Sequence, residues 1–119
     1  MPVPAAASSD TVVKLLRAAE WEAFRASGGF AGSPDDLRDG FIHLSTPEQV
    51  AGTAERHFAG EDGLVAVTLR LAGDPALRWE VSRGGQRFPH LYRPLALVDV
   101  AEARRYSAGP ESAEARSTS

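Results

Sequence analysis

The sequence predicts one small α+β domain that spans residues 11–106. The chain has 119 residues, of which 43% are apolar, which is enough for one hydrophobic core and too little for two. Some segments alternate apolar and polar side chains with the period of a strand, while others have the spacing of an amphipathic helix. Residues 1–10 and 107–119 contain almost nothing large to bury, so both are predicted to be disordered tails.

The first two elements are predicted to be a strand and a helix. Residues 12–16 are β-branched or aliphatic apart from Lys14, which is typical of a largely buried strand. Residues 18–26 carry aromatic side chains at helical spacing, and two glycines at positions 28 and 29 end this short helix.

A second strand is predicted over residues 40–45, after irregular chain with a proline turn over residues 30–39. Alternation along this strand directs Phe41, His43 and Ser45 to one face and the aliphatic residues between them to the other. His43 and Ser45 are therefore expected to point the same way.

A second helix is predicted to begin at Thr46. The string Thr-Pro-Glu-Gln supplies a capping hydroxyl, a proline at the first helical position, and Gln49 three residues after the cap. The helix is expected to run to about residue 57 or 58, with Val50, Ala54 and Phe58 facing the core.

The C-terminal half of the sequence is predicted to consist mainly of strands. Residues 63–71 alternate as a central strand, and residues 77–81 form the next one. Residues 88–92 are expected to be extended chain near a sheet edge, because their proline cannot donate a hydrogen bond to a neighbour. Residues 95–103 are predicted to return as one apolar strand.

The composition excludes several classes of function. Cysteine is absent, so disulfides, thiolate nucleophiles and thiolate metal sites are ruled out. The formal net charge of −3 makes long nucleic acid an unlikely partner. No apolar run is long enough to span a membrane and no secretory signal is recognisable, so a soluble cytoplasmic protein is expected. The oligomeric state stays open.

Positive charge is concentrated in one short stretch of the chain. Between positions 78 and 93 there are arginines at 78, 83, 87 and 93 and a single acid, Glu80. Such a local excess of positive charge can attract small anions.

His43 is the first candidate site residue. It lies at the end of a predicted strand, directly before a helix N-terminus, where free amides and a partial positive charge favour bound anions. The hydroxyls of Ser45 and Thr46 could contact the same ligand, although at least one is expected to cap the helix. The alternative is a half-buried histidine that is hydrogen-bonded to backbone.

Glu80, His90 and Tyr92 are the next candidates. Glu80 could stabilise developing positive charge or act as a general base, or it could simply form an ion pair with a neighbouring arginine such as Arg78. His90 and Tyr92 share a face of their segment and could form a pocket wall or ordinary packing. The three histidines lack the spacing of a zinc site, so no metal is predicted.

Five blocks of the sequence, in this order, resemble the bacterial and plant family known as domain of unknown function 952. Members of that family look like small relatives of the ADP-ribosyltransferase fold, and no activity is settled for the family as a whole. The resemblance therefore implies two short, mainly antiparallel sheets that flank a cleft, with two or three helices. The blocks are Gly40-Phe41-Ile42-His43-Leu44-Ser45-Thr46, Gln49-Val50, His57-Phe58, Leu77-Arg78-Trp79-Glu80 and Phe88-Pro89-His90-Leu91-Tyr92.

The resemblance implies a set of site residues and a ligand. By analogy to the wider fold, the cleft would hold nicotinamide adenine dinucleotide (NAD), with His43, Glu80 and His90 as the catalytic residues. The family usually has a glycine after the tyrosine, where this chain has Arg93, which would add charge at the cleft edge or face solvent. The expected ligand-binding residues are Lys14, Ser45, Thr46, Arg78, Trp79, Arg83 and Tyr92.

Two classes of function remain open at the level of sequence. The first is an enzyme that processes an anionic or phosphate-bearing small molecule, with NAD-type ribosyl transfer as the leading reaction and a cyclase, hydrolase or isomerase as a variant. The second is a module that binds a metabolite or a peptide without turning it over.

Overall fold

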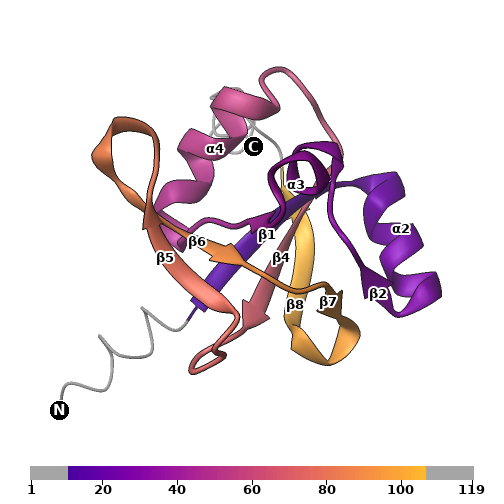
Figure 1. Cartoon of the computed structure of the whole chain (residues 1–119). Coiled ribbons are helices and arrows are strands. Elements are labelled where there is room, and N and C mark those ends of the chain that lie inside the picture. Colours follow the sequence, from indigo (N-terminus) through magenta and orange to yellow (C-terminus); the bar gives the residue numbers. More distant parts are fainter. Residues whose placement is uncertain (1–10, 107–119) are drawn as a thin grey trace, which may run out of the picture.

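The computed structural model describes residues 11–106, and the two predicted disordered tails lie outside these residues. The described part is a small α+β domain with antiparallel sheets and three α-helices. Figure 1 shows the β5–β6 hairpin at the left of the picture and helix α2 at the right, with β1 and β4 between them. The helices are α2 (Ala18–Ser27), α3 (Pro34–Asp39) and α4 (Val50–His57), with 3₁₀ turns η1 (Pro47–Gln49), η2 (Arg83–Gly85) and η3 (Leu97–Asp99). The strands are β1 (Thr11–Arg17), β2 (Gly29–Phe30), β3 (Ile42–His43), β4 (Leu64–Arg70), β5 (Leu77–Val81), β6 (Arg87–Leu91), β7 (Leu95–Ala96) and β8 (Val100–Tyr106).

The main sheet has the order β1-β4-β8, and β4 is its central strand, as its sequence predicts. Both faces of β1 are covered. Val12 and Leu16 belong to the larger core, whereas Val13 and Leu15 pack with Val50 of α4 in a second cluster. Burial on both faces explains why β1 is apolar almost throughout.

A second sheet pairs β2 with β7, and a third has the order β3-β6-β5. An isolated bridge between Val13 and Ser45 joins β1 to the chain that follows β3, with N···O distances of 2.8 and 2.9 Å in the two directions. This bridge brings the side chain of Lys14 next to His43, although the two residues are far apart in the sequence.

Helix α3 corrects the prediction of irregular chain over residues 30–39. The backbone N–H of Ser33 donates to the Asp36 carboxylate at 2.8 Å, Pro34 occupies the first turn, and the helix ends at Gly40, which has a φ of 86°. Proline at that position loses no helical hydrogen bond, and a positive φ favours glycine. The predicted turn at Pro34 is thus the first turn of a helix.

The predicted strand over residues 95–103 is also wrong, because the chain turns at η3 and separates β7 from β8. The carboxylate of Asp99 is buried, and it accepts hydrogen bonds from the backbone N–H of Ala96 at 2.9 Å and from Arg93 at 2.9 and 3.1 Å. These bonds hold a tight turn that leaves Val98 82% exposed.

Strand β6 lies between β3 and β5, so the expectation of an edge position for residues 88–92 is wrong. Pro89 is accommodated because its carbonyl accepts from the N–H of Leu44 at 3.0 Å, on the β3 side. The N–H and C=O of one strand residue point to the same side, so the missing N–H removes no bond to β5.

No helix within residues 11–106 is both long and apolar enough to cross a membrane.

Candidate functional site

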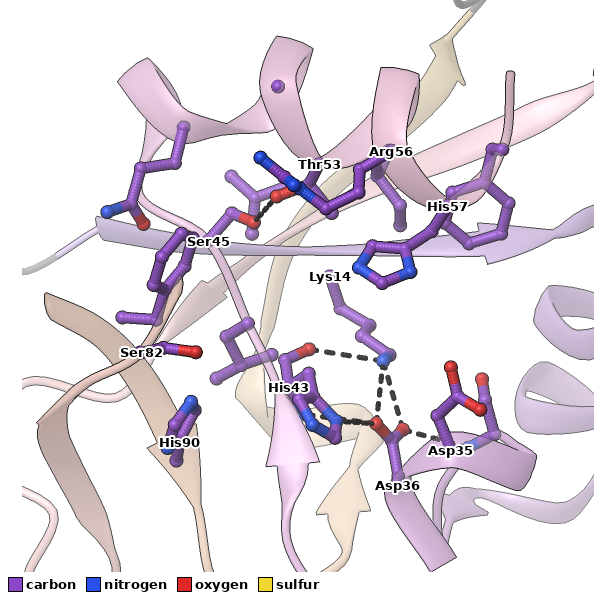
Figure 2. Close-up of a pocket in the computed structure, with 18 of the residues that line it drawn as sticks. Lys14, Asp35, Asp36, His43, Ser45, Thr53, Arg56, His57, Ser82 and His90 are labelled. Carbon is purple, nitrogen blue, oxygen red and sulfur yellow. Dashed lines mark hydrogen bonds and ion pairs between the residues drawn. The ribbon is translucent and has the colours of Figure 1, made fainter. Parts of the chain in front are cut away.

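A cleft of about 1050 Å³ lies between helices α3 and α4, above strands β1, β3 and β6. Figure 2 shows α4 on one side of it, with Thr53, Arg56 and His57, and Asp35 and Asp36 of α3 on the other. The floor carries polar side chains from the three strands and the chain after β3, namely Lys14, His43, Ser45 and His90. This volume is at the upper end of the range for small-molecule sites.

A buried ion pair closes the α3 side of the cleft. Lys14 is only 6% exposed, and its Nζ lies 2.9 Å from Oδ2 and 3.3 Å from Oδ1 of Asp36, which is 2% exposed. Nζ also donates to the backbone carbonyl of His43 at 3.1 Å. The three contacts match the three donors of an ammonium group, so Lys14 is committed to the protein itself.

The Asp36 carboxylate is held ionised in spite of its burial. Burial by itself raises the pKa of Asp36, but the hydrogen bond to the His43 ring and the charge of Lys14 act against it. The backbone N–H groups of His43 and Ser33 add two further donors, at 3.0 and 2.8 Å. Together these contacts lower the pKa from 3.8 to about 2.

The His43 ring has a carboxylate at each nitrogen. Nδ1 lies 2.7 Å from Oδ1 of Asp36, and Nε2 lies 3.0 Å from Oδ2 of Asp39. A carboxylate can only accept, so each of these oxygens is an acceptor for the ring nitrogen beside it. The half-buried histidine that sequence reasoning considered is thus bonded through its ring to two acids of α3.

His90 has a carboxylate behind one nitrogen only. Its Nδ1 lies 2.7 Å from Oε1 of Glu80, and the same oxygen accepts from the hydroxyl of Tyr92 at 2.8 Å. The hydrogen bond to His90 contributes most to lowering the pKa of Glu80, and the bond to Tyr92 lowers it further. The bond to Glu80 in turn raises the pKa of Tyr92. His90 lines the cleft, whereas Glu80 and Tyr92 stand behind it and do not.

Aromatic stacking orients the two histidines. The Phe41 ring stacks on His90 with centroids 4.1 Å apart and is tilted against His43 at 4.6 Å. His43 and His90 are paired in register between β3 and β6, and their ring centroids are 5.7 Å apart. The predicted convergence of His43, Glu80 and His90 therefore occurs, with His90 between the other two.

The two hydroxyl residues after His43 line the cleft but have partners in the protein. Ser45 Oγ lies 2.7 Å from Thr53 Oγ1 of α4. Thr46 caps the helical segment as predicted, since its Oγ1 accepts from the N–H of Gln49 at 3.2 Å and its own N–H donates to Gln49 at 3.0 Å.

The arginines of the positive stretch whose side chains the structure describes, Arg78, Arg87 and Arg93, do not line the cleft. The guanidinium of Arg78 lies over the Tyr92 ring at 5.6 Å, and neither residue lines the cleft. Trp79 is on the other face of β5 and is partly exposed. Arg93 does not line the cleft; its partly exposed side chain bridges Asp74 at 2.7 Å and Asp99 at 2.9 Å. The side chain of Arg83 lies outside what the structure describes.

Sequence reasoning missed several residues of the cleft. On α4, the side chains of Thr53, Arg56 and His57 line the cleft, and none of them was predicted to be a site residue. Asp36 and Asp39 were missed because α3 was missed. The signal was present, since Ser33-Pro34-Asp35-Asp36 has a hydroxyl, a proline and an acceptor at the same spacing as Thr46-Pro47-Glu48-Gln49.

Within residues 11–106, no three His, Cys, Asp or Glu side chains are arranged to hold a metal ion.

Fold and site together define a small α+β domain with a histidine-lined cleft. The family described as protein of unknown function DUF952 matches residues 15–103, and the chain belongs to this family. The search of curated proteins finds no match.

Solved structures of one relative share this fold. The crystal structure of protein CC0527 from Caulobacter crescentus is 47% identical in sequence, with a TM-score of 0.77, over 80% of this chain and 84% of that one. A double mutant of CC0527 gives a TM-score of 0.76 at the same identity and coverage. The solution NMR structure of CC0527 is 44% identical, with a TM-score of 0.77, over 86% of this chain and 89% of that one.

Proposed function

We propose that the domain is an enzyme that binds a phosphate-bearing, anionic small molecule in the cleft, with ribosyl transfer from NAD as its reaction. The observation that carries the enzymatic part is His90, a cleft-lining imidazole with an ionised carboxylate fixed behind it. Carboxylate-backed imidazoles serve widely as acid–base groups, because the carboxylate fixes the ring orientation and the tautomer.

The cleft offers suitable contacts for such a ligand. Its volume of about 1050 Å³ admits a molecule of dinucleotide size, and its walls present Arg56 together with Gln49 and Thr53, whose side chains also contact the Arg87 carbonyl at 2.8 Å and Ser45 at 2.7 Å. Guanidinium, amide and hydroxyl groups are the donors that phosphates commonly bind. Lys14 is not counted among them, since Asp36 neutralises it.

The choice of NAD rests on analogy. The sequence blocks around His43, Glu80 and His90 resemble a family that looks related to the ADP-ribosyltransferase fold, and in that fold the cleft holds NAD. Fold analogy alone does not determine function, so the choice needs a direct test.

Titration of the isotope-labelled protein with NAD tests the proposal. Amide signals of cleft residues are expected to shift at millimolar NAD, and nicotinamide should appear in the solution by chromatography. Glu80→Gln and His43→Ala should slow its release, whereas Arg25→Gln, on the exposed side of α2, serves as the matched control. If NAD causes no shift and no nicotinamide is released, the proposal is wrong.

A binding module without catalysis is the second candidate. It is favoured by the internal commitment of the cleft's polar groups, since Lys14 is bonded to Asp36, and His43 to Asp36 and Asp39. In that case Glu80→Gln and His43→Ala lower ligand affinity, and no product forms from NAD. A cyclase, hydrolase or isomerase that uses the same cleft would instead leave NAD intact and convert another metabolite.

A further inference from the structure

The two ring nitrogens of His90 differ in their surroundings. Nδ1 lies 2.7 Å from Oε1 of Glu80, whereas Nε2 has no hydrogen-bond partner among residues 11–106. His90 is 6% exposed, yet no buried side-chain nitrogen or oxygen in the described residues lacks a partner. An Nε2 atom without a partner is therefore in contact with solvent, and the cleft that His90 lines supplies the opening.

The Glu80 carboxylate determines which nitrogen of a neutral His90 carries the proton. An ionised carboxylate only accepts, so Nδ1 must donate, and the lone pair remains on Nε2. The Tyr92 hydroxyl donates to the same oxygen of Glu80 at 2.8 Å, and stacking on Phe41 fixes the plane of the ring. His90 is thus held with a proton-accepting atom open to the cleft.

The other acids near the two histidines are less suited to accept a proton from a ligand. Glu80 does not line the cleft, and its pKa is lowered by its bonds to His90 and Tyr92. Asp36 is buried and bonded to Lys14 and His43. Both nitrogens of His43 are already bonded to carboxylates.

We infer that Nε2 of His90 is the general base that deprotonates the ribosyl acceptor, that this acceptor is a hydroxyl group, and that Glu80 is a positioning residue. This inference rests on the proposed ribosyl transfer. An acceptor that is already anionic would need no base, whereas water or an alcohol must lose a proton as it attacks.

The step balances without a further reactant. The acceptor O–H gives its proton to Nε2 of His90, while its oxygen forms a bond to C1′ of the ribose. The bond from C1′ to the nicotinamide nitrogen breaks, its electron pair stays on the ring, and neutral nicotinamide leaves. The imidazolium of His90 then releases its proton to solvent.

Two measurements without substrate test the state of His90. Nitrogen NMR of the histidine rings should show the neutral ring protonated at Nδ1, and Glu80→Gln should weaken this preference because an amide can also donate to Nδ1. Glu80→Asp retains an acceptor-only group and should preserve the tautomer. Diethyl pyrocarbonate, which acylates unprotonated imidazole nitrogens, should modify His90 faster than His43 in peptide mass maps. A neutral His90 protonated at Nε2, or faster modification of His43, would overturn the inference.

Kinetics then separate the roles of the two residues. His90→Gln should lower kcat for nicotinamide release on the order of 10²- to 10⁴-fold, as for other general bases. Glu80→Gln should lower kcat about 10- to 100-fold with KM unchanged, because it acts through His90. Glu80→Asp should restore part of the rate, and Arg25→Gln should match the wild type.

The outcomes distinguish the inference from the proposed function. If NAD neither binds nor releases nicotinamide, the proposed ribosyl transfer fails, and with it the assignment of an acceptor, whatever the state of His90. If nicotinamide is released but folded His90→Gln retains the full rate, ribosyl transfer stands and the general base is wrong. If His90→Gln does not fold, the effects of Glu80→Gln on kcat and on the ring nitrogens decide the question.

Discussion

His43 and His90 are neighbours across β3 and β6, and each has Nδ1 at 2.7 Å from a carboxylate, yet their environments differ. The His43 carboxylate, Asp36, is 2% exposed and also binds buried Lys14, whereas the side chain of Glu80 behind His90 is 38% exposed. A second acid, Asp39, occupies Nε2 of His43. Both ring nitrogens of His43 thus lie beside carboxylates, whereas only Nδ1 of His90 does.

The difference shows that a carboxylate next to a histidine can stabilise the fold in one place and only orient the ring in another. Removing one member of a buried charge pair leaves the other charge without compensation in a medium of low dielectric. When an exposed carboxylate is removed, water can solvate the group that it contacted. Variants of the three acids around the two histidines test this contrast directly.

Asp36→Asn is expected to have the largest effect. It retains the shape of the side chain but leaves the ammonium of Lys14 buried without an anion, which costs about 3–5 kcal/mol of stability. Urea denaturation measures the loss. Adding Lys14→Met should recover part of it, and Asp35→Asn, on the exposed side of α3, is the matched control. Equal stability of Asp36→Asn and the control would show that the buried pair does not stabilise the fold.

Acid should produce the next largest effect, through the same carboxylate. The pKa of Asp36 is lowered from 3.8 to about 2 on folding, so the unfolded chain binds this proton more tightly. The stabilisation is therefore complete above about pH 4 and is lost as the pH falls to about 2, and it amounts to about 2 kcal/mol. Denaturation curves between pH 2 and pH 5 measure it, with Asp36→Asn as the reference in which this contribution is missing.

Glu80→Gln should leave the unfolding midpoint unchanged, in contrast to Asp36→Asn. Its side chain is partly exposed and no buried cation depends on it, since Arg78 lies over Tyr92 at the surface. Thermal unfolding monitored by circular dichroism checks this expectation. A clear drop in the midpoint would mean that the carboxylate behind His90 is as structural as the one behind His43.

Asp39→Asn should have the smallest effect on the fold and should make His43 more like His90. Oδ2 of the exposed Asp39 lies 3.0 Å from Nε2 of His43, and a neutral amide at that place is a weaker acceptor than a carboxylate. Diethyl pyrocarbonate is expected to modify His43 faster in Asp39→Asn than in the wild type, with Asp35→Asn as the control variant. No change in the rate would show that Asp36 alone protects His43.

Much of the local structure could be predicted from short-range patterns. The cap at Thr46 predicts the start of the helical segment that leads into α4. The alternation of Phe41, His43 and Ser45 predicts the side chains that line the cleft from β3 and the residues on either side of it. Such features depend on residues two to four positions apart, so the sequence displays them directly.

Other features depend on partners that are distant in the chain. Lys14 and Asp36 are 22 residues apart, and Arg93 and Asp74 are 19 residues apart. A sequence shows the charge of Lys14 and Arg93 but not the acid that neutralises it. For this reason Lys14 was expected to bind a ligand, and Arg93 was expected to add charge at the cleft edge or to face solvent. Both are bonded to acids within the protein.

The sequence by itself therefore determined the α+β class, the order of most elements, the membership of the family and the convergence of His43, Glu80 and His90. The tertiary structure alone decided which of the two cleft-lining histidines has both ring nitrogens beside carboxylates and which has only one. The physical reason is that the role of an ionisable side chain is determined by the charges, burial and hydrogen bonds around it. These are brought to it by α3, β5 and β6 only when the chain folds.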